Sequence, residues 1–103
     1  MFDKDQDRYI TRGIESELPK SLVIILWELI EEAKKDTKLD YLQVFELERV
    51  ENKENKVIQK VTHRQEVPEY RKVIHLEIKD PVDEKVFAID DKSHSTMLLA
   101  SEY

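Results

Sequence analysis

The stretch LPKSLVIILWELIEEA, residues 18–33, decides the fold because its apolar residues recur with a helical period over four turns. At about 100° per residue, one narrow stripe collects Leu18, Leu22, Ile25, Leu26, Leu29 and Ala33, flanked by Val23 and Ile30. Pro19 suits the first turn of a helix, where the N–H group that it lacks is not needed. Lys34 and Lys35 suit the other end, because their charges complement the helix dipole. We therefore predict one main helix that begins near Leu18 and frays after Ala33.

Two large apolar residues of this helix lie outside the stripe. Ile24 and Trp27 fall on the far side, among charged residues. A helix that only covers a sheet does not need apolar side chains there, so either another segment of the chain or another molecule covers them. The short C-terminal segment is the one intramolecular candidate. If it does not reach them, the two residues would form a helix-against-helix contact in a twofold dimer. Ile24 and Trp27 are thus the predicted partner surface.

Length and composition limit the class of protein. A chain of 103 residues has room for one domain, 1–103. The sequence has no cysteine, which excludes disulfides, thiolate metal sites and cysteine nucleophiles. Residues 1–8 are charged and lack an apolar signal region, and the longest apolar run, 22–27, is too short to span a bilayer. We expect a cytoplasmic protein that does not bind a membrane.

Charge and glycine content argue against two further classes. The net charge is −6, and acidic and basic residues are interleaved along the chain. The negative charge argues against nucleic-acid binding, which needs clustered Lys and Arg residues. The interleaving argues against a DNA mimic, which needs long acidic arrays without intervening cations. The single glycine, Gly13, excludes a dinucleotide fingerprint, a P-loop and a nucleophile elbow, because these motifs use several glycines. We expect no cofactor.

Strand-like alternation accounts for most of the remaining chain. Strands are predicted at 8–11, 41–50, 57–67, 70–78 and 86–89. The segment 96–100 fits either a returning strand, which we favour, or a terminal helix. Leu42 and Val44 make the first half of its strand apolar on both faces, so we expect that half to be central or covered twice.

The loop between the second and third predicted strands constrains their register. An odd loop length pairs Phe45 with Val61 and Arg49 with Val57, and keeps the apolar odd positions on one face. An even loop would instead set Phe45 beside Thr62. The predicted core of helix and sheet comprises Leu22, Ile25, Leu26, Leu29, Phe45, Leu47, Val61, Ile74 and Leu76.

Two of the three histidines lie in the next hairpin. A four-residue type I turn over 67–70 pairs His63 with Ile74 and sets His75 opposite Thr62, on the other face of the sheet. We therefore expect no two-histidine metal site, and no metal-binding motif supports one. His63 is predicted to be half-buried and His75 exposed.

A polar loop at 90–95 holds the densest group of residues that can do chemistry. Asp90, Asp91 and His94 are compatible with a small hydrolase or transferase site. The same residue types also build tight turns, because Asp and Ser side chains bond to nearby backbone N–H groups. Nothing marks a strained nucleophile or an oxyanion hole, so we predict no catalytic residue and keep this loop as an alternative site. A concave pocket at this loop would support the alternative that the protein is an enzyme.

Four motifs in order resemble a known family. They are YITRG (9–13), LDYLQVF (39–45), QEVPEY (65–70) and HSTMLLASEY (94–103). Together they are similar to domain-of-unknown-function family 960, a family of short uncharacterised proteins of low-GC Gram-positive bacteria and their phages. The resemblance spans nearly the whole chain. It implies a compact small domain in a cytosolic or phage-associated setting, and it brings no activity, cofactor or catalytic residue.

These observations predict an α+β fold, with one main helix packed on a mostly antiparallel sheet of about five to six strands. The favoured function is a non-enzymatic protein–protein interaction module, with self-association as a homodimer included. The first alternative is a small enzyme with a polar site near Asp90, Asp91 and His94. The second is an acidic inhibitor or DNA-mimic protein.

Overall fold

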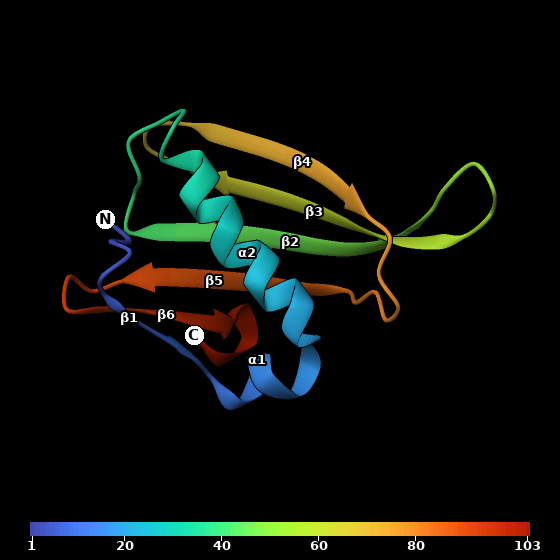
Figure 1. Ribbon diagram of the computed structural model, residues 1–103, viewed down its shortest axis with the longest axis horizontal. Coiled ribbons are helices and arrows are strands. Elements are labelled where there is room, and N and C mark those ends of the chain that lie inside the picture. Colours follow the sequence, from blue (N-terminus) through green and yellow to red (C-terminus); the bar gives the residue numbers. More distant parts are fainter.

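The computed structural model describes residues 1–103 and contains a six-stranded sheet with two α-helices on one of its faces (Figure 1). The elements are β1 (Asp7–Ile10), α1 (Arg12–Glu17), α2 (Lys20–Ala33), β2 (Leu42–Glu51), β3 (Val57–Gln65), β4 (Tyr70–Leu76), β5 (Glu84–Asp90), β6 (His94–Leu99) and the 3₁₀ helix η1 (Ala100–Glu102). The strand order is β1-β6-β5-β2-β3-β4, and every pair is antiparallel except β1–β6. The predicted α+β fold is confirmed.

The segment predicted as one helix begins later than expected, because a separate short helix precedes it. Thr11 caps α1 by accepting a hydrogen bond from the backbone N–H of Ile14 at 3.3 Å. Leu18 is extended between α1 and α2, as is usual for a residue before proline. The apolar period did not reveal α1, because Ile14 is its one buried residue. Neither helix combines the length and apolar character needed to cross a membrane.

The core lies between α2 and the sheet and contains 18 buried residues. Six of the nine predicted core residues belong to it, and the other three, Ile25, Ile74 and Leu76, are partly buried against it. The other twelve residues of the core were not in the predicted set, and among them Phe2 and Trp27 lie outside the predicted apolar stripe and strands.

The β2–β3 hairpin has the predicted faces and a different register. Phe45 pairs with His63, and Leu47 pairs with Val61, so the strands are shifted by two residues from the prediction. An even shift leaves every side chain on its face, because the period of a strand is two residues. The strands are joined by the loop 52–56, whose odd length agrees with the prediction.

The β3–β4 hairpin shows the same two-residue error. His63 pairs with Lys72, two residues from its predicted partner, and the shift applies equally to His75. The turn occupies 66–69 and contains a cis Val67–Pro68 bond, which a type I turn does not have. His63 and His75 lie on opposite faces as predicted, but His63 is completely rather than half buried.

Candidate functional site

The two apolar residues outside the helix stripe have different environments. Ile24 is 58% exposed, whereas Trp27 is 9% exposed. The guanidinium of Arg8, in β1, lies over the Trp27 ring at 4.9 Å from its centroid, a cation–π contact. Arg8 also forms an ion pair with Glu31, one turn further along α2, at 2.5 Å. The expectation that both side chains are exposed therefore holds for Ile24 and is wrong for Trp27.

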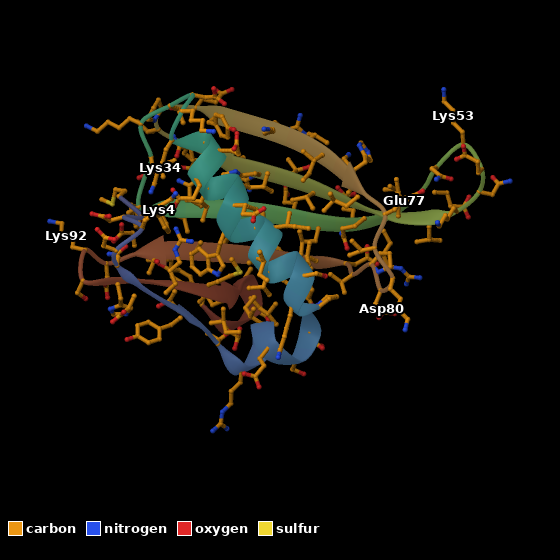
Figure 2. All side chains as sticks on the ribbon, viewed as in Figure 1. Lys4, Lys34, Lys53, Glu77, Asp80 and Lys92 are labelled. Carbon is orange, nitrogen blue, oxygen red and sulfur yellow. The ribbon has the colours of Figure 1, made fainter.

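The N-terminal segment, not the C-terminal one, closes this side of the helix. The side chain of Phe2 is completely buried, and its carbonyl oxygen accepts a hydrogen bond from Nζ of Lys34 at the end of α2. Lys34 lies beside the N-terminal segment that carries Lys4 (Figure 2). β1 then continues along the edge of the sheet and brings Arg8 over Trp27 (Figure 1).

Asp90 holds the N-terminal segment in place and does not form a polar site with the hairpin turn. Its buried carboxylate accepts hydrogen bonds from the backbone N–H of Phe2, from Nε2 of Gln6 at 3.1 Å and from the backbone N–H of Lys92 at 2.6 Å. Burial raises the pKa of Asp90, but these hydrogen bonds favour the charged form, and the net pKa lies below its usual value.

Asp91, Ser93 and His94 form the β5–β6 turn. Oδ1 of Asp91 accepts hydrogen bonds from the backbone N–H groups of Ser93 and His94 at 3.0 and 2.9 Å, and from the Ser93 hydroxyl at 2.9 Å. The bond from the His94 amide is the largest cause of the lowered pKa of Asp91. Nε2 of His94 lies 3.1 Å from Oδ2 of Asp91. The three side chains satisfy one another within a turn, and neither surface groove of the protein includes them.

A buried polar network, which the sequence analysis missed, joins β2 to β3. Oε1 of Gln43 lies 2.7 Å from Nε2 of His63, and Nε2 of Gln43 donates to Oε1 of Gln65 at 2.7 Å and to the Asp40 carbonyl at 3.0 Å. Both amide hydrogens of Gln43 are thus used, so its oxygen accepts and His63 carries its proton on Nε2.

His63 is neutral at pH 7 and is closed to any substrate. Burial, and to a smaller degree the charge of Lys72, lowers the pKa of His63 to about 4. Its ring stacks on Phe45 with centroids 4.5 Å apart, and its Nδ1 is buried without a hydrogen-bond partner. Through Gln65, the network also holds the carbonyls of Lys38 and Pro68 at 2.9 and 2.8 Å. The buried network therefore fastens the two loops that contain Lys38 and Pro68 to the end of the sheet.

The larger of two surface grooves lies beside Ile24. It has a volume of about 440 Å³ and is lined by Ile10, Glu15, Leu18, Lys20, Val23 and Ile24. These residues come from the end of β1, from α1 and its connection to α2, and from the first turns of α2. A smaller groove of about 290 Å³ surrounds the β3–β4 turn. The first groove is mainly apolar and open, which suits the binding of an apolar side chain.

The helices α1 and α2 lie on one face of the sheet (Figure 1). The other face carries a cluster of apolar residues, in which the Phe87 ring contacts the Tyr103 ring edge to face, with centroids 5.6 Å apart. We refer to it as the open-face patch; its residues are Leu42, Val44, Phe87, Ile89 and Leu98. The expectation that the start of β2 is central is met, since β2 lies between β5 and β3. Only one face of β2 is covered by helix.

Comparisons with known proteins give a family and a fold. The family described as "Staphylococcal protein of unknown function (DUF960)" matches residues 7–102. The structure described as "Crystal structure of the protein of unknown function from Enterococcus faecalis" is similar, with 31% sequence identity and a TM-score of 0.80. The similarity covers 99% of this chain and 94% of that chain. A comparison with curated proteins gives no match.

Proposed function

This chain belongs to the DUF960 family of proteins of unknown function, and we propose that it acts by binding another protein rather than by catalysis. The observation that supports the proposal is the apolar groove beside Ile24, next to the free edge of β1. The polar groups offer less to a substrate. His63 is completely buried, and the side chains of Asp91 and His94 are held within their own turn.

The free edge of β1 has backbone groups that can pair with an added strand. The backbone N–H of Thr11 donates to the carbonyl of Met97 in β6 at 3.1 Å. Because alternate residues of a parallel strand face the same neighbour, the backbone groups of Arg8 and Ile10 point away from β6. Strand addition to such an edge is a common way to bind an extended peptide.

The groove defines the chemistry of the partner segment. Ile10 is 41% exposed and Ile24 is 58% exposed, so a strand beside β1 would cover both with an aliphatic side chain. Lys20 and Glu15 form no ion pair within the chain and supply one charge of each sign at the groove. The occupant that we infer is an extended segment with a branched aliphatic residue next to a charged one.

The DNA-mimic alternative finds no comparable support. Mimicry of nucleic acid needs acidic side chains without neighbouring cations. On the sheet, Glu46 lies 3.4 Å from Arg64, and Glu48 lies 3.9 Å from Lys60. These acidic residues are therefore balanced locally.

Peptides selected from a random display library on the intact protein test the proposal. We expect the selected peptides to contain Val, Ile or Leu and to shift the backbone amide resonances of Ile10 and Ile24. Ile24→Glu should weaken their binding at least about tenfold, which corresponds to roughly 1.4 kcal/mol. Val67→Glu, an exposed aliphatic residue on the distant β3–β4 turn, is the matched control and should leave binding unchanged. Peptides that shift other residues, or that bind the Ile24→Glu variant equally well, would contradict the proposal.

A further inference from the structure

The 3₁₀ helix η1 brings one carboxylate, that of Glu102, to the start of α1 (Figure 1). Its Oε1 accepts hydrogen bonds from the hydroxyl of Thr11 at 2.7 Å and from the backbone N–H of Leu99 at 2.8 Å. Its Oε2 accepts a longer one from the backbone N–H of Gly13 at 3.3 Å. Leu99 ends β6 and is buried in the core, whereas Thr11 caps α1. Glu102 therefore ties the N-terminus of α1 to the end of a core strand.

The single glycine of the sequence lies under this carboxylate. Gly13 is in α1 and its φ is negative, so its backbone conformation is open to any residue. Glycine also costs stability relative to alanine inside a helix. A Cβ atom on residue 13 would, however, lie 2.5–2.7 Å from the carboxylate atoms of Glu102. The close approach of Glu102 is therefore what this position needs glycine for.

Few other contacts hold α1. A helix of its length, six residues, is not stable by itself in water. Ile14 is its one buried residue, and its charged side chains form no ion pair within the chain; these are Arg12, Glu15 and Glu17. A carboxylate at the N-terminus of a helix also interacts favourably with the helix dipole. The position of α1 therefore depends on Ile14 and on Glu102.

The same helix forms one wall of the apolar groove. Glu15 lies in α1 and Leu18 directly follows it, while Ile10 directly precedes Thr11. The groove residues outside α2 are thus joined through the segment that Glu102 holds. A wall that is already in place costs less conformational entropy when a partner binds.

We infer that Glu102 is a positioning residue of the groove. Through Thr11 and Gly13 it holds α1 in the conformation that accepts the partner segment. The inference rests on the proposed function, since it concerns the same groove. Any change that withdraws Glu102 from α1 would loosen the groove from outside it, so the C-terminal turn is a point of control over binding.

Hydrogen exchange of the unbound protein, followed by NMR, tests the first step. The backbone N–H groups of Glu15 and Leu18 donate to the carbonyls of Thr11 and Ile14, so they report on α1. Glu102→Ala should speed their exchange about tenfold or more, because α1 then opens locally, and should leave the amides of the central strand β2 unchanged. Glu54→Ala is the matched control, an exposed acidic residue of the distant loop 52–56 that forms no ion pair.

Peptide affinity tests the second step. For peptides that shift the Ile24 resonance, Glu102→Ala should raise the dissociation constant about tenfold, measured where circular dichroism shows every variant to be folded. Glu102→Gln should recover most of the affinity, because its amide oxygen can still accept from Thr11 and Leu99. A loss of overall stability alone would not change the affinity of the folded molecules and would not be rescued in this way.

Three outcomes decide between the proposals. Unchanged exchange of α1 in the Glu102→Ala variant would overturn the inference. Peptides that bind at Ile24 with equal affinity for Glu102→Ala would also overturn it and leave the proposed function standing. If no peptide binds at Ile24, the proposed function fails and the inference fails with it. Should Glu102→Ala not fold, Glu102→Asp takes its place, since the shorter side chain keeps the charge and cannot reach Thr11.

Discussion

The backbone N–H of Phe2 donates a hydrogen bond to the carboxylate of Asp90, 88 residues further along the chain. The carbonyl of Phe2 accepts from Lys34, so both backbone groups of this residue are held by side chains from the helix and the sheet. The N-terminal segment is thereby a structural part of the core. The same segment leads into β1, where the guanidinium of Arg8 lies over the Trp27 ring. The N-terminal segment therefore accounts for the burial of Trp27.

Replacement of Phe2 tests this role of the N-terminal segment. Phe2→Ala should lower the free energy of unfolding by about 3–5 kcal/mol, because it removes a completely buried ring and leaves a cavity. Urea unfolding followed by circular dichroism measures the change. Lys4→Ala, at an exposed position in the same segment, is the control. A loss well under 1 kcal/mol for Phe2→Ala would mean that the segment does not contribute to the core.

The Asp90 carboxylate should make stability depend on acidity. Its pKa in the folded protein is below the value in the unfolded chain, about 3.9. The stabilisation is therefore complete above that value and is lost as the pH falls through the folded pKa. Asp90→Asn should lower stability at pH 7 and reduce the slope of stability against pH below about pH 4. Urea unfolding at pH 7 and pH 3 measures both effects, and an unchanged slope would contradict the prediction.

The sequence predicted elements better than register, for a physical reason. The main helix α2 and the six strands lie close to their predicted positions, because the longer elements each have their own apolar period. Both hairpin registers were wrong by two residues, since an even shift leaves the apolar faces unchanged. What decides the register is loop length. β2 continues to Glu51, which pairs with Val57, so the loop between the two strands is only five residues long. The alternation of apolar and polar faces alone does not reveal how long this loop is.

The candidate site was predicted in part. The angular position of Ile24 on the helix correctly predicted its exposure. The same reasoning predicted that Trp27 is exposed, which is wrong, because a helix lying on a flat sheet leaves that side uncovered and here the N-terminal segment covers it. The segment that covers Trp27 has no period of its own and contributes a single aromatic anchor, Phe2, so no pattern pointed to it. A signal for the buried network was present: Gln43 and Gln65 share the odd positions of the core face. Polar side chains at such positions need hydrogen-bond partners.

His63 should make folding sensitive to pH in a different range from Asp90. Its pKa is about 4 in the folded protein and about 6.5 in the unfolded chain. Between these values the unfolded chain binds a proton that the folded protein excludes, so stability falls as the pH is lowered from about 6.5 to 4. At about 1.4 kcal/mol per pKa unit, the loss amounts to roughly 3 kcal/mol.

An NMR titration of the imidazole resonances checks this prediction. His63 should remain neutral down to about pH 4, while the exposed His75 serves as the internal comparison. The decline in stability between pH 6.5 and pH 5 should be smaller in a His63→Gln variant. A His63 resonance that titrates near pH 6.5 would show that the ring is accessible to water and would reopen the question of a site there.

Gly13 and Glu102 should be coupled, because the carboxylate approaches the glycine closely. Glu102 accepts hydrogen bonds from the Thr11 hydroxyl at 2.7 Å, from the Leu99 amide at 2.8 Å and from the Gly13 amide at 3.3 Å. These bonds lower the pKa of Glu102, the one from Thr11 most. A Cβ atom on residue 13 would lie 2.5 Å from Oε1 of Glu102. Gly13→Ala would therefore push the carboxylate out of its hydrogen bonds.

A double-mutant cycle separates this contact from the intrinsic preference of the helix. In the natural chain, Gly13→Ala should lower stability, since the lost hydrogen bonds outweigh the gain of about 0.5–1 kcal/mol from alanine in a helix. In a Glu102→Ala background, the obstacle is absent, and the same substitution should raise stability. The expected coupling is about 1 kcal/mol or more. Thermal unfolding of the four proteins measures it. Equal effects of Gly13→Ala in both backgrounds would show that the carboxylate does not rest against the helix.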